Sequence, residues 1–397
     1  MSSRVFAPIE ADLLVWARQS IGYDMTHAAK KIGISEDKLR SWESGDAQPT
    51  VTQLRKISNV YKRPLAVFFL PKRPSKFDKP FSALDLRDFR RLPDTEKQKL
   101  SPALLLELKK AEERREVVLS LMEEQAIDTP TFELSASQDD TPETLAERVR
   151  IRLNVSLEEQ FSWDNPNTAF RHWSRIIEAV GVLVFQTGFY QGEGVKLQEM
   201  RGIAISMPTL PIILLNGADA ASGRIFTLFH ELGHLLKRVS GISDVIEIMS
   251  AFTPDEQIEV FCNQFAAEFL VPTKALLEEP TVRQHRPGWE WSDDEIEKLA
   301  SRFKVSREVV VRRLTTIQVV SADFYRAKRQ QYKEEAEGRA GKKKKPGAPA
   351  RDRMLAKWHG GKYVTTVLDA YRNDVITLND VHDYLGAKTP QVDKLLR

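Results

Sequence analysis

The sequence predicts a multidomain protein that is mainly α-helical, with an α+β domain in the middle of the chain and an all-α domain at the N-terminus. Two patterns lead to this prediction. Residues 9–70 divide into short amphipathic segments that are separated by glycine, serine and threonine signals for helix ends. Three short apolar runs within 181–216 have the length of strands, and an almost wholly apolar helical stretch follows them. The length of 397 residues also favours two or three domains.

The composition is that of an ordinary globular protein. With 42% hydrophobic and 29% charged residues the chain can bury real cores, and a net charge of +3 is too small to require a polyanionic partner for the whole molecule. The single cysteine rules out an internal disulfide framework. The N-terminus lacks a signal-peptide pattern, and no apolar run approaches the roughly 20 residues that span a bilayer. We therefore expect a soluble, cytoplasmic protein without a membrane partner.

The stretch 224–272 carries the chemistry. It contains H-E-L-G-H, in which His230 and His234 are four residues apart and so lie one turn apart on one face of a helix. Two imidazoles in this arrangement can hold one metal ion, and Glu231 can take a proton from a water molecule there. The flanking residues are nearly all apolar, so the helix should be buried, and buried polar side chains need partners. A metal site explains this pattern better than two hydrogen-bonded core histidines do.

A zinc site of this kind takes a third protein ligand, and four downstream carboxylates are candidates: Asp255, Glu256, Glu259 and Glu268. Apolar periodicity predicts a helix over 255–270. On that helix Glu259 and Glu268 are about half a revolution out of phase, so they cannot both face the metal. Glu259 precedes Asn263 by one turn, and an amide there can accept the outer N–H of a ligand histidine. We therefore expect Glu259 as third ligand, Asn263 behind a ligand histidine, and a structural or substrate-side role for Glu268.

The order of these motifs, H-E-L-G-H and then E-x-x-x-N-x-F-A-A-E-F-L-V-P, resembles the ImmA/IrrE family of bacterial metallopeptidases over residues 165–275. The family belongs to the zincins whose third ligand is a glutamate. The resemblance implies a zincin-like core with one Zn²⁺ per chain, His230, His234 and Glu259 as ligands, and Glu231 as general base. Cys262 departs from the family's alanine, and we expect it to pack as a small buried residue. Two residues are candidates for the oxyanion donor, although the sequence places neither near the metal: Tyr190 and His172.

The N-terminal segment has the helix-turn-helix pattern of a short helix, a glycine turn, and a serine-capped helix that ends in W-E-x-G. It resembles the XRE (lambda-repressor-like) family, which implies a recognition helix at 35–41. That helix begins with Glu36 and Asp37, whose charge opposes phosphate, so docking to a protein stays open beside DNA contact. The candidate DNA contacts are Thr26, Ser35, Lys38 and Arg40.

Linkers and composition changes set the remaining boundaries. Proline punctuation and a lysine-rich, glycine-containing run mark the segments that connect the domains. The expected parts are a helix-turn-helix domain at 1–71, a linker and helical segment at 72–160, a zincin-like metallopeptidase domain at 161–280, a helix-turn-helix-like module at 281–330, a charged flexible linker at 331–353, and a small helical module at 354–397. Strands of the peptidase domain are expected at 181–186, 202–206 and 211–216.

The two resemblances together imply a regulatory zinc endopeptidase that cleaves an XRE-type repressor in a bacterial stress-response or mobile-element switch. A further hypothesis is that the enzyme is latent, because a constantly active endopeptidase would harm the cytoplasm. The alternative is a DNA-binding, antitoxin-like regulator whose zinc domain binds a partner toxin without turnover. Glu231 favours the enzyme, because a pure binding module has no use for a general base. The expected partners are an XRE-type repressor or a cognate toxin, with operator DNA as a further ligand. An oligomer is compatible with both the peptidase and the antitoxin-like regulator.

Overall fold

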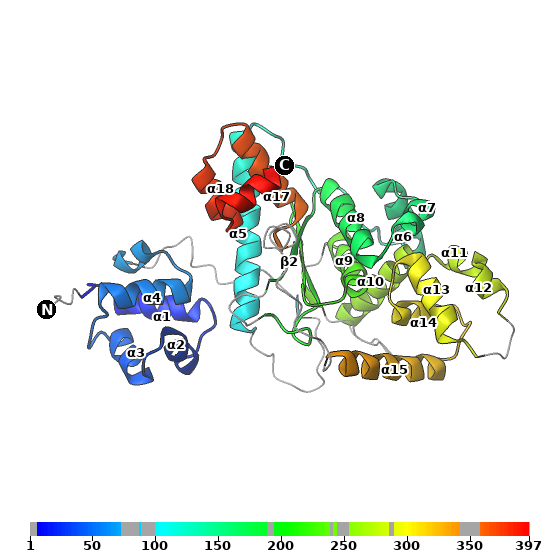
Figure 1. Cartoon of the computed structure of the whole chain (residues 1–397), viewed down its shortest axis with the longest axis horizontal. Coiled ribbons are helices and arrows are strands. Elements are labelled where there is room, and N and C mark those ends of the chain that lie inside the picture. Colours follow the sequence, from blue (N-terminus) through cyan, green and yellow to red (C-terminus); the bar gives the residue numbers. More distant parts are fainter. Residues whose placement is uncertain are drawn as a thin grey trace. The chain divides into compact units, whose positions relative to one another are not determined.

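The structure is a computed structural model that describes residues 6–72, 87–88, 100–188, 194–238, 241–243, 254–285, 290–340 and 358–396. The chain divides into two compact units, the first made of Met1–Asp85 and Asp94–Lys110 and the second of Leu86–Pro93 and Ala111–Arg397. Helices predominate and the strands belong to the second unit (Figure 1), which is the mainly α fold with an α+β core that the sequence predicts. Among the described residues, no helix is long and apolar enough to cross a bilayer.

The first unit begins with five helical segments: α1 (Ala11–Gln19), α2 (Met25–Ile32), α3 (Glu36–Glu43), α4 (Val51–Tyr61) and the 3-10 helix η1 (Leu65–Phe69). Helices α2 and α3 form the helix-turn-helix. Ser35 caps α3 by accepting the backbone N–H of Lys38, and Gly33 ends α2 in the left-handed region at φ 74°. Arg18 of α1 pairs with Glu43 of α3 at 2.7 Å, which ties the helix-turn-helix to the rest of its core.

A five-stranded sheet forms the centre of the second unit, in the order β1 (Arg87–Asp88), β5 (Gly241–Ser243), β3 (Gly202–Ile205), β4 (Ile212–Leu215) and β2 (Leu183–Gln186). The three strands expected from sequence are present, whereas β1 and β5 are too short to give a pattern. Strand β3 runs antiparallel to both neighbours, and its Gly202 pairs with Leu215 and with Ser243. The outer strands of the described sheet are therefore β1 and β2.

Fourteen further helices occur in the described part of the chain: α5 (Pro102–Glu124, which begins in the first unit), α6 (Pro142–Leu153), α7 (Leu157–Ser162), α8 (Pro166–Ala179), α9 (Ala221–Leu236), α10 (Pro254–Leu270), α11 (Thr273–Glu278), α12 (Pro280–Arg283), α13 (Asp293–Phe303), α14 (Arg307–Thr316), α15 (Ala322–Ala340), α17 (Gly361–Arg372), α18 (Leu378–Leu385) and α19 (Thr389–Leu396).

Helix α9 lies at the heart of the main core, with α8 and α10 packed against it. The ring of Phe229 on α9 stacks on Phe269 of α10 at 4.1 Å and meets Trp173 of α8 edge to face at 4.9 Å. Gly233 allows close contact between α9 and α10, because a Cβ there would lie 3.1 Å from the Sγ of Cys262. Cys262 is fully buried, as the sequence predicts, and burial raises the pKa of its thiol.

The helical module after α10 is held by ion pairs that the sequence does not reveal. Arg313 of α14 is buried, pairs with Glu268 of α10, and donates to the carbonyl of Val271 at 2.9 Å. Arg307 of α14 pairs with Glu335 of α15. These two arginines therefore hold α14 against α10 and α15.

The prediction of a charged flexible linker at 331–353 is wrong for residues 331–340, because α15 continues to Ala340. Contacts with the preceding helices explain the difference. Lys328 and Gln331 bond to the carboxylate of Asp293 on α13 at 2.9 Å each, and Arg307 binds Glu335. These bonds stabilise α15 as a helix, although its highly charged composition is typical of a linker. Residues 341–353 lie outside the described residues.

The C-terminal helices dock on β2 and α8 through a buried carboxylate. Glu178 of α8 is 6% exposed and accepts the backbone N–H groups of Gly361 and Lys362 at the start of α17. Burial raises the pKa of Glu178 to about 7, although these two hydrogen bonds act in the opposite direction. Beside it, the rings of Phe185 and Tyr363 meet edge to face at 6.3 Å.

This carboxylate makes stability depend on pH. The pKa of Glu178 is about 7 in the folded chain and 4.5 ordinarily, so the folded state binds this proton more tightly than the unfolded state does. The stability that this proton binding adds is fully present below pH 4.5 and is lost as the pH rises through about 7. Glu178→Gln keeps an acceptor for the helix start and cannot ionise. We expect urea unfolding at pH 5 and pH 8 to show a loss of up to about 3 kcal/mol at the higher pH in the wild type and a smaller loss in the variant. Equal losses in both proteins would contradict this account.

Candidate metal centre

The H-E-L-G-H motif lies on the buried part of α9, where every residue from 224 to 236 is buried. His230 and His234 are fully buried, and their Nε2 atoms lie 3.1 Å apart. The helical spacing of four residues is what turns both imidazoles to one side. The two rings thus present nitrogen atoms to the same point inside the core.

Helix α10 brings a carboxylate to that point. The Oε2 of Glu259 lies 3.3 Å from the Nε2 of His230, and its Oε1 lies 3.0 Å from the Nε2 of His234. The ligand atoms of these three buried residues all lie within 4.8 Å of one another, and no other such group of three occurs among the described residues. Two imidazole nitrogens and one carboxylate, gathered inside the core, fit the ligand set of a bound metal ion.

Asn263, one turn after Glu259, fixes the orientation of the first imidazole. Its Oδ1 lies 3.1 Å from the Nδ1 of His230. An amide oxygen only accepts, so Nδ1 carries the proton and Nε2 presents its lone pair to the cluster. This is the tautomer that a metal ligand needs.

The charges of the cluster favour a cation. Burial acts to raise the pKa of Glu259, but the two histidines outweigh it and hold this pKa at about 2. Burial lowers the pKa of His234. Burial also acts to lower the pKa of His230, yet the charge of Glu259 raises it on balance. The carboxylate is therefore ionised at neutral pH, and at least one imidazole is neutral and able to ligate.

Glu231 is fully buried and lies against the first residue of β3. A Cβ at Gly202 would lie 2.5 Å from the Oε1 of Glu231 and 2.5 Å from the Cγ2 of Thr227, one turn earlier on α9. Glycine at this position is what leaves room for the carboxylate beside the sheet. The motifs in the sequence do not point to Gly202 or Thr227, although a glycine that opens a strand before the motif helix is a signal for such a close approach.

The other candidates have different surroundings. Glu268 bonds to the backbone N–H and hydroxyl of Thr273 at 2.9 Å and pairs with Arg313, so its role is structural. Glu256 is buried but does not belong to the cluster. The imidazole of His172 stacks on Trp163 with ring centroids 5.0 Å apart. Two candidates fall outside the described side chains: Asp255 and Tyr190.

The four candidate DNA contacts all lie on the surface of the helix-turn-helix, at Thr26, Ser35, Lys38 and Arg40. Ser35 also serves as the cap of α3, and the Nζ of Lys38 lies 5.6 Å from the ring of Trp42. Surface exposure allows contact with a phosphate backbone but does not require it. These contacts therefore stay predictions.

Comparison with known families agrees with this geometry. Residues 177–315 match the family model of the IrrE N-terminal-like domain (Peptidase_M78), and residues 14–68 match a helix-turn-helix model (HTH_3). No curated protein matches the chain. The first match contains α9 and α10 with the metal cluster, and the second contains α2 and α3. The two family resemblances found in the sequence are thus confirmed: a metallopeptidase-type domain and a helix-turn-helix domain share one chain.

Proposed function

We propose that this protein is a regulatory zinc-dependent endopeptidase whose substrate is a protein, an XRE-type transcriptional repressor. The observation that carries the proposal is the buried cluster of His230, His234 and Glu259, with Glu231 beside it, inside a domain that matches a peptidase family. The set of two imidazoles and one carboxylate suits Zn²⁺ better than Ca²⁺ or Mg²⁺, which prefer oxygen ligands alone.

In this proposal the three clustered residues hold the zinc ion, and Asn263 keeps His230 in the tautomer that binds it. When bound, the ion supplies Lewis-acid activation of a water molecule and of the scissile carbonyl. Glu231 accepts the proton of the attacking water on its carboxylate. It then gives that proton to the leaving amine nitrogen, which completes hydrolysis of the peptide bond.

Gly202 is a positioning residue for Glu231 in this mechanism. In Gly202→Ala the new methyl would meet the Oε1 of Glu231 at 2.5 Å, so the carboxylate must move. We expect the cleavage rate to fall by about 10²-fold while the zinc content is unchanged. Gly338→Ala is a matched control, because a Cβ at that position meets nothing within 4 Å. A Gly202→Ala protein with the wild-type rate would contradict this role.

The helix-turn-helix domain supports the choice of a transcriptional substrate. A module of the type used by DNA-binding repressors, on the same chain as the peptidase domain, can bring it to a repressor, to operator DNA, or to both. The second candidate function, an antitoxin-like regulator whose zinc domain binds a toxin without turnover, uses the same two domains. The presence of Glu231 in a fully buried position favours the peptidase.

The test combines metal analysis with cleavage. Purified full-length protein is assayed for bound zinc and is incubated with an XRE-type repressor or a toxin encoded beside it, with and without a chelator. The proposal would be supported by one zinc ion per chain together with cleavage of the repressor. This cleavage should stop when the chelator is added and return when zinc is restored. Bound zinc with tight binding and no cleavage would favour the antitoxin-like regulator, and absence of zinc would refute both.

A further inference from the structure

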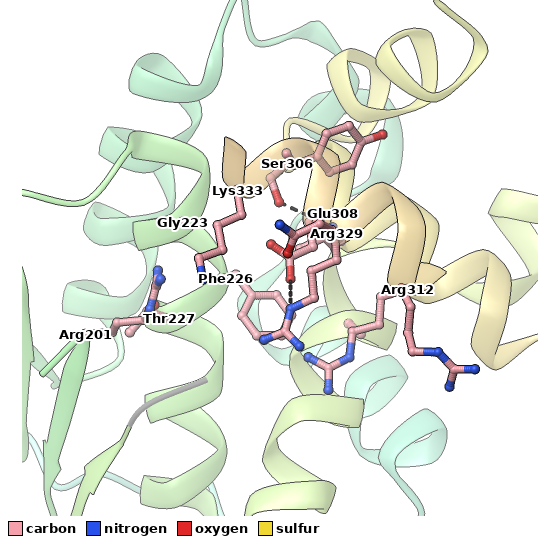
Figure 2. A pocket seen from close by; sticks show the side chains of 14 residues that line it. Arg201, Gly223, Phe226, Thr227, Ser306, Glu308, Arg312, Arg329 and Lys333 are labelled. Carbon is pink, nitrogen blue, oxygen red and sulfur yellow. Dashed lines mark hydrogen bonds and ion pairs between the residues drawn. The ribbon is translucent and has the colours of Figure 1, made fainter. Parts of the chain in front are cut away.

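A recess of about 680 Å³ lies between α9, α14 and α15, and its lining is strongly basic (Figure 2). Apolar surface comes from Phe226, Ala267 and Val309, and within the described part of the chain Glu308 is the only acidic residue of the lining. The remaining charged side chains of the lining are all cationic: Arg201, Arg312, Arg326, Arg329 and Lys333.

Part of this charge is neutralised by neighbours. The Nη1 of Arg201 lies 3.0 Å from a carboxylate oxygen of Asp219, and the Nε of Arg329 lies 3.5 Å from Glu308. Arg326 pairs with an aspartate one turn earlier on its own helix. The Arg201–Asp219 pair is partly buried and the other two pairs are more exposed, and pairs at least partly open to solvent can exchange with another anion because each contributes little free energy.

Two of the cations stay unneutralised. Within the described part of the chain, neither Arg312 nor Lys333 forms an ion pair. Lys333 is exposed and extends from α15 toward α9, and Arg312 projects from α14 (Figure 2). The recess therefore presents excess positive charge beside apolar surface, a combination that suits an anionic group on a larger chain.

The recess adjoins the catalytic carboxylate. Thr227 lines it, and the methyl of Thr227 and the Oε1 of Glu231 each lie 2.5 Å from the same point beside Gly202. Arg201, the residue before Gly202, also lines it, and Ala267 lies one turn beyond Asn263 on α10. A polypeptide whose scissile bond lies at Glu231 would have its neighbouring residues within reach of this basic surface.

We propose that the recess is a specificity subsite that binds acidic side chains of the polypeptide substrate next to the scissile bond. This inference rests on the proposed function, because it concerns the substrate of the same centre. Aspartate or glutamate side chains would bind Arg312 and Lys333 and displace the weak internal pairs. The apolar residues of the lining would contact the adjoining part of the peptide.

The surroundings favour a polypeptide over nucleic acid. Helix α14 is the second helix of the helix-turn-helix-like pair, but it packs against α15 and its Arg313 is buried in the pair with Glu268. It is therefore not presented as a free recognition helix. Glu308 inside the lining would also repel a continuous phosphate backbone, whereas a short acidic segment can avoid it.

The test uses full-length Glu231→Gln protein, so that binding is measured without turnover. Two labelled peptides of identical length serve as probes, one with four Asp and Glu residues and one with Asn and Gln in their places, followed by fluorescence anisotropy at about 0.1 M salt. We expect the acidic peptide to bind at least 10-fold more tightly than its amide counterpart. Charge reversal by Arg312→Glu with Lys333→Glu should abolish this preference.

The matched control is Lys298→Glu with Arg171→Glu, which makes the same change in net charge at two exposed residues outside the recess. It should retain most of the preference. Arg312→Gln with Lys333→Gln, which introduces no new charge, is a second variant in case the reversed protein unfolds. An absent preference, or an equal loss in the control, would overturn the proposal. A single-stranded oligonucleotide that binds more tightly than the acidic peptide, and that no longer binds to the Arg312→Glu, Lys333→Glu protein, would overturn the proposal in favour of a nucleic-acid site.

A cleavage assay separates this proposal from the proposed function. With the Glu231 carboxylate intact, charge reversal in the recess should raise KM for an acidic-flanked substrate and leave kcat nearly unchanged. Cleavage with an unchanged KM would refute the subsite and leave the peptidase standing. Selective binding of the acidic peptide by a protein that cleaves nothing would refute the peptidase and leave an acidic-peptide site.

Discussion

Glu231→Gln is expected to reduce cleavage by about 10³-fold or more and to leave bound zinc at one per chain. The substitution keeps the size of a side chain that is fully buried against Gly202, so the packing of α9 should not change. It removes only the ability to accept a proton, and Glu231 is not one of the three clustered ligand residues. The measurements are the single-turnover cleavage rate and the zinc content of the same preparation.

The matched control for this substitution is Glu178→Gln, which makes the same chemical change at another buried glutamate of the second unit. Glu178 lies on α8, where it accepts hydrogen bonds from the start of α17, and its substitution should retain the wild-type cleavage rate. If Glu231→Gln keeps full activity, the general-base assignment is wrong. If Glu231→Gln loses zinc as well as activity, the carboxylate serves the metal cluster instead.

Glu259→Ala should lose zinc. The carboxylate lies 3.3 Å and 3.0 Å from the Nε2 atoms of His230 and His234, and its removal leaves two imidazoles without an anion beside them. Loss of a partner outside the ligand set typically costs 10-fold to 100-fold in metal affinity, so loss of a ligand should cost more than about 100-fold. Competition with a chromophoric chelator measures this affinity directly.

Glu268→Ala separates loss of a ligand from loss of structure, because Glu268 is a buried glutamate on the same helix α10. Its carboxylate pairs with Arg313, and breaking a buried pair on one side costs about 3–5 kcal/mol. We expect this variant to unfold at lower urea concentration yet to bind zinc with unchanged affinity. Unchanged zinc affinity in Glu259→Ala would mean that Glu259 is not the third ligand.

The juxtaposition of two histidines and one glutamate on α9 and α10 could be predicted from the sequence because helical periodicity is a local rule. Spacing alone places His230 and His234 on one face, and the half-turn difference between Glu259 and Glu268 follows from one helix. Gly233 lets α10 approach α9 closely, and a small residue on a helix face is likewise a local signal. The same rules predicted the three longer strands, whose apolar runs are clear.

Other features depend on contacts between segments far apart in the chain, which no periodicity encodes. The room for Glu231 comes from Gly202, which lies on another element. The ordered end of α15 depends on Arg307 binding Glu335, so composition alone suggested a linker there. The basic recess likewise joins Arg201 to side chains of α14 and α15 that lie more than a hundred positions later.

The docking of the C-terminal helices has a consequence for how the protein behaves in concentrated solution. Leu183 and Thr187 donate their backbone N–H groups toward β4. The backbone carbonyl of Val184 therefore points to the outer edge of β2, where Gly360 lies against it. An uncovered outer strand is a template on which another molecule can add a strand. The segment around Gly360 therefore shields this edge from pairing with another molecule. We expect a chain that ends before residue 358 to expose the edge of β2 and to self-associate more readily.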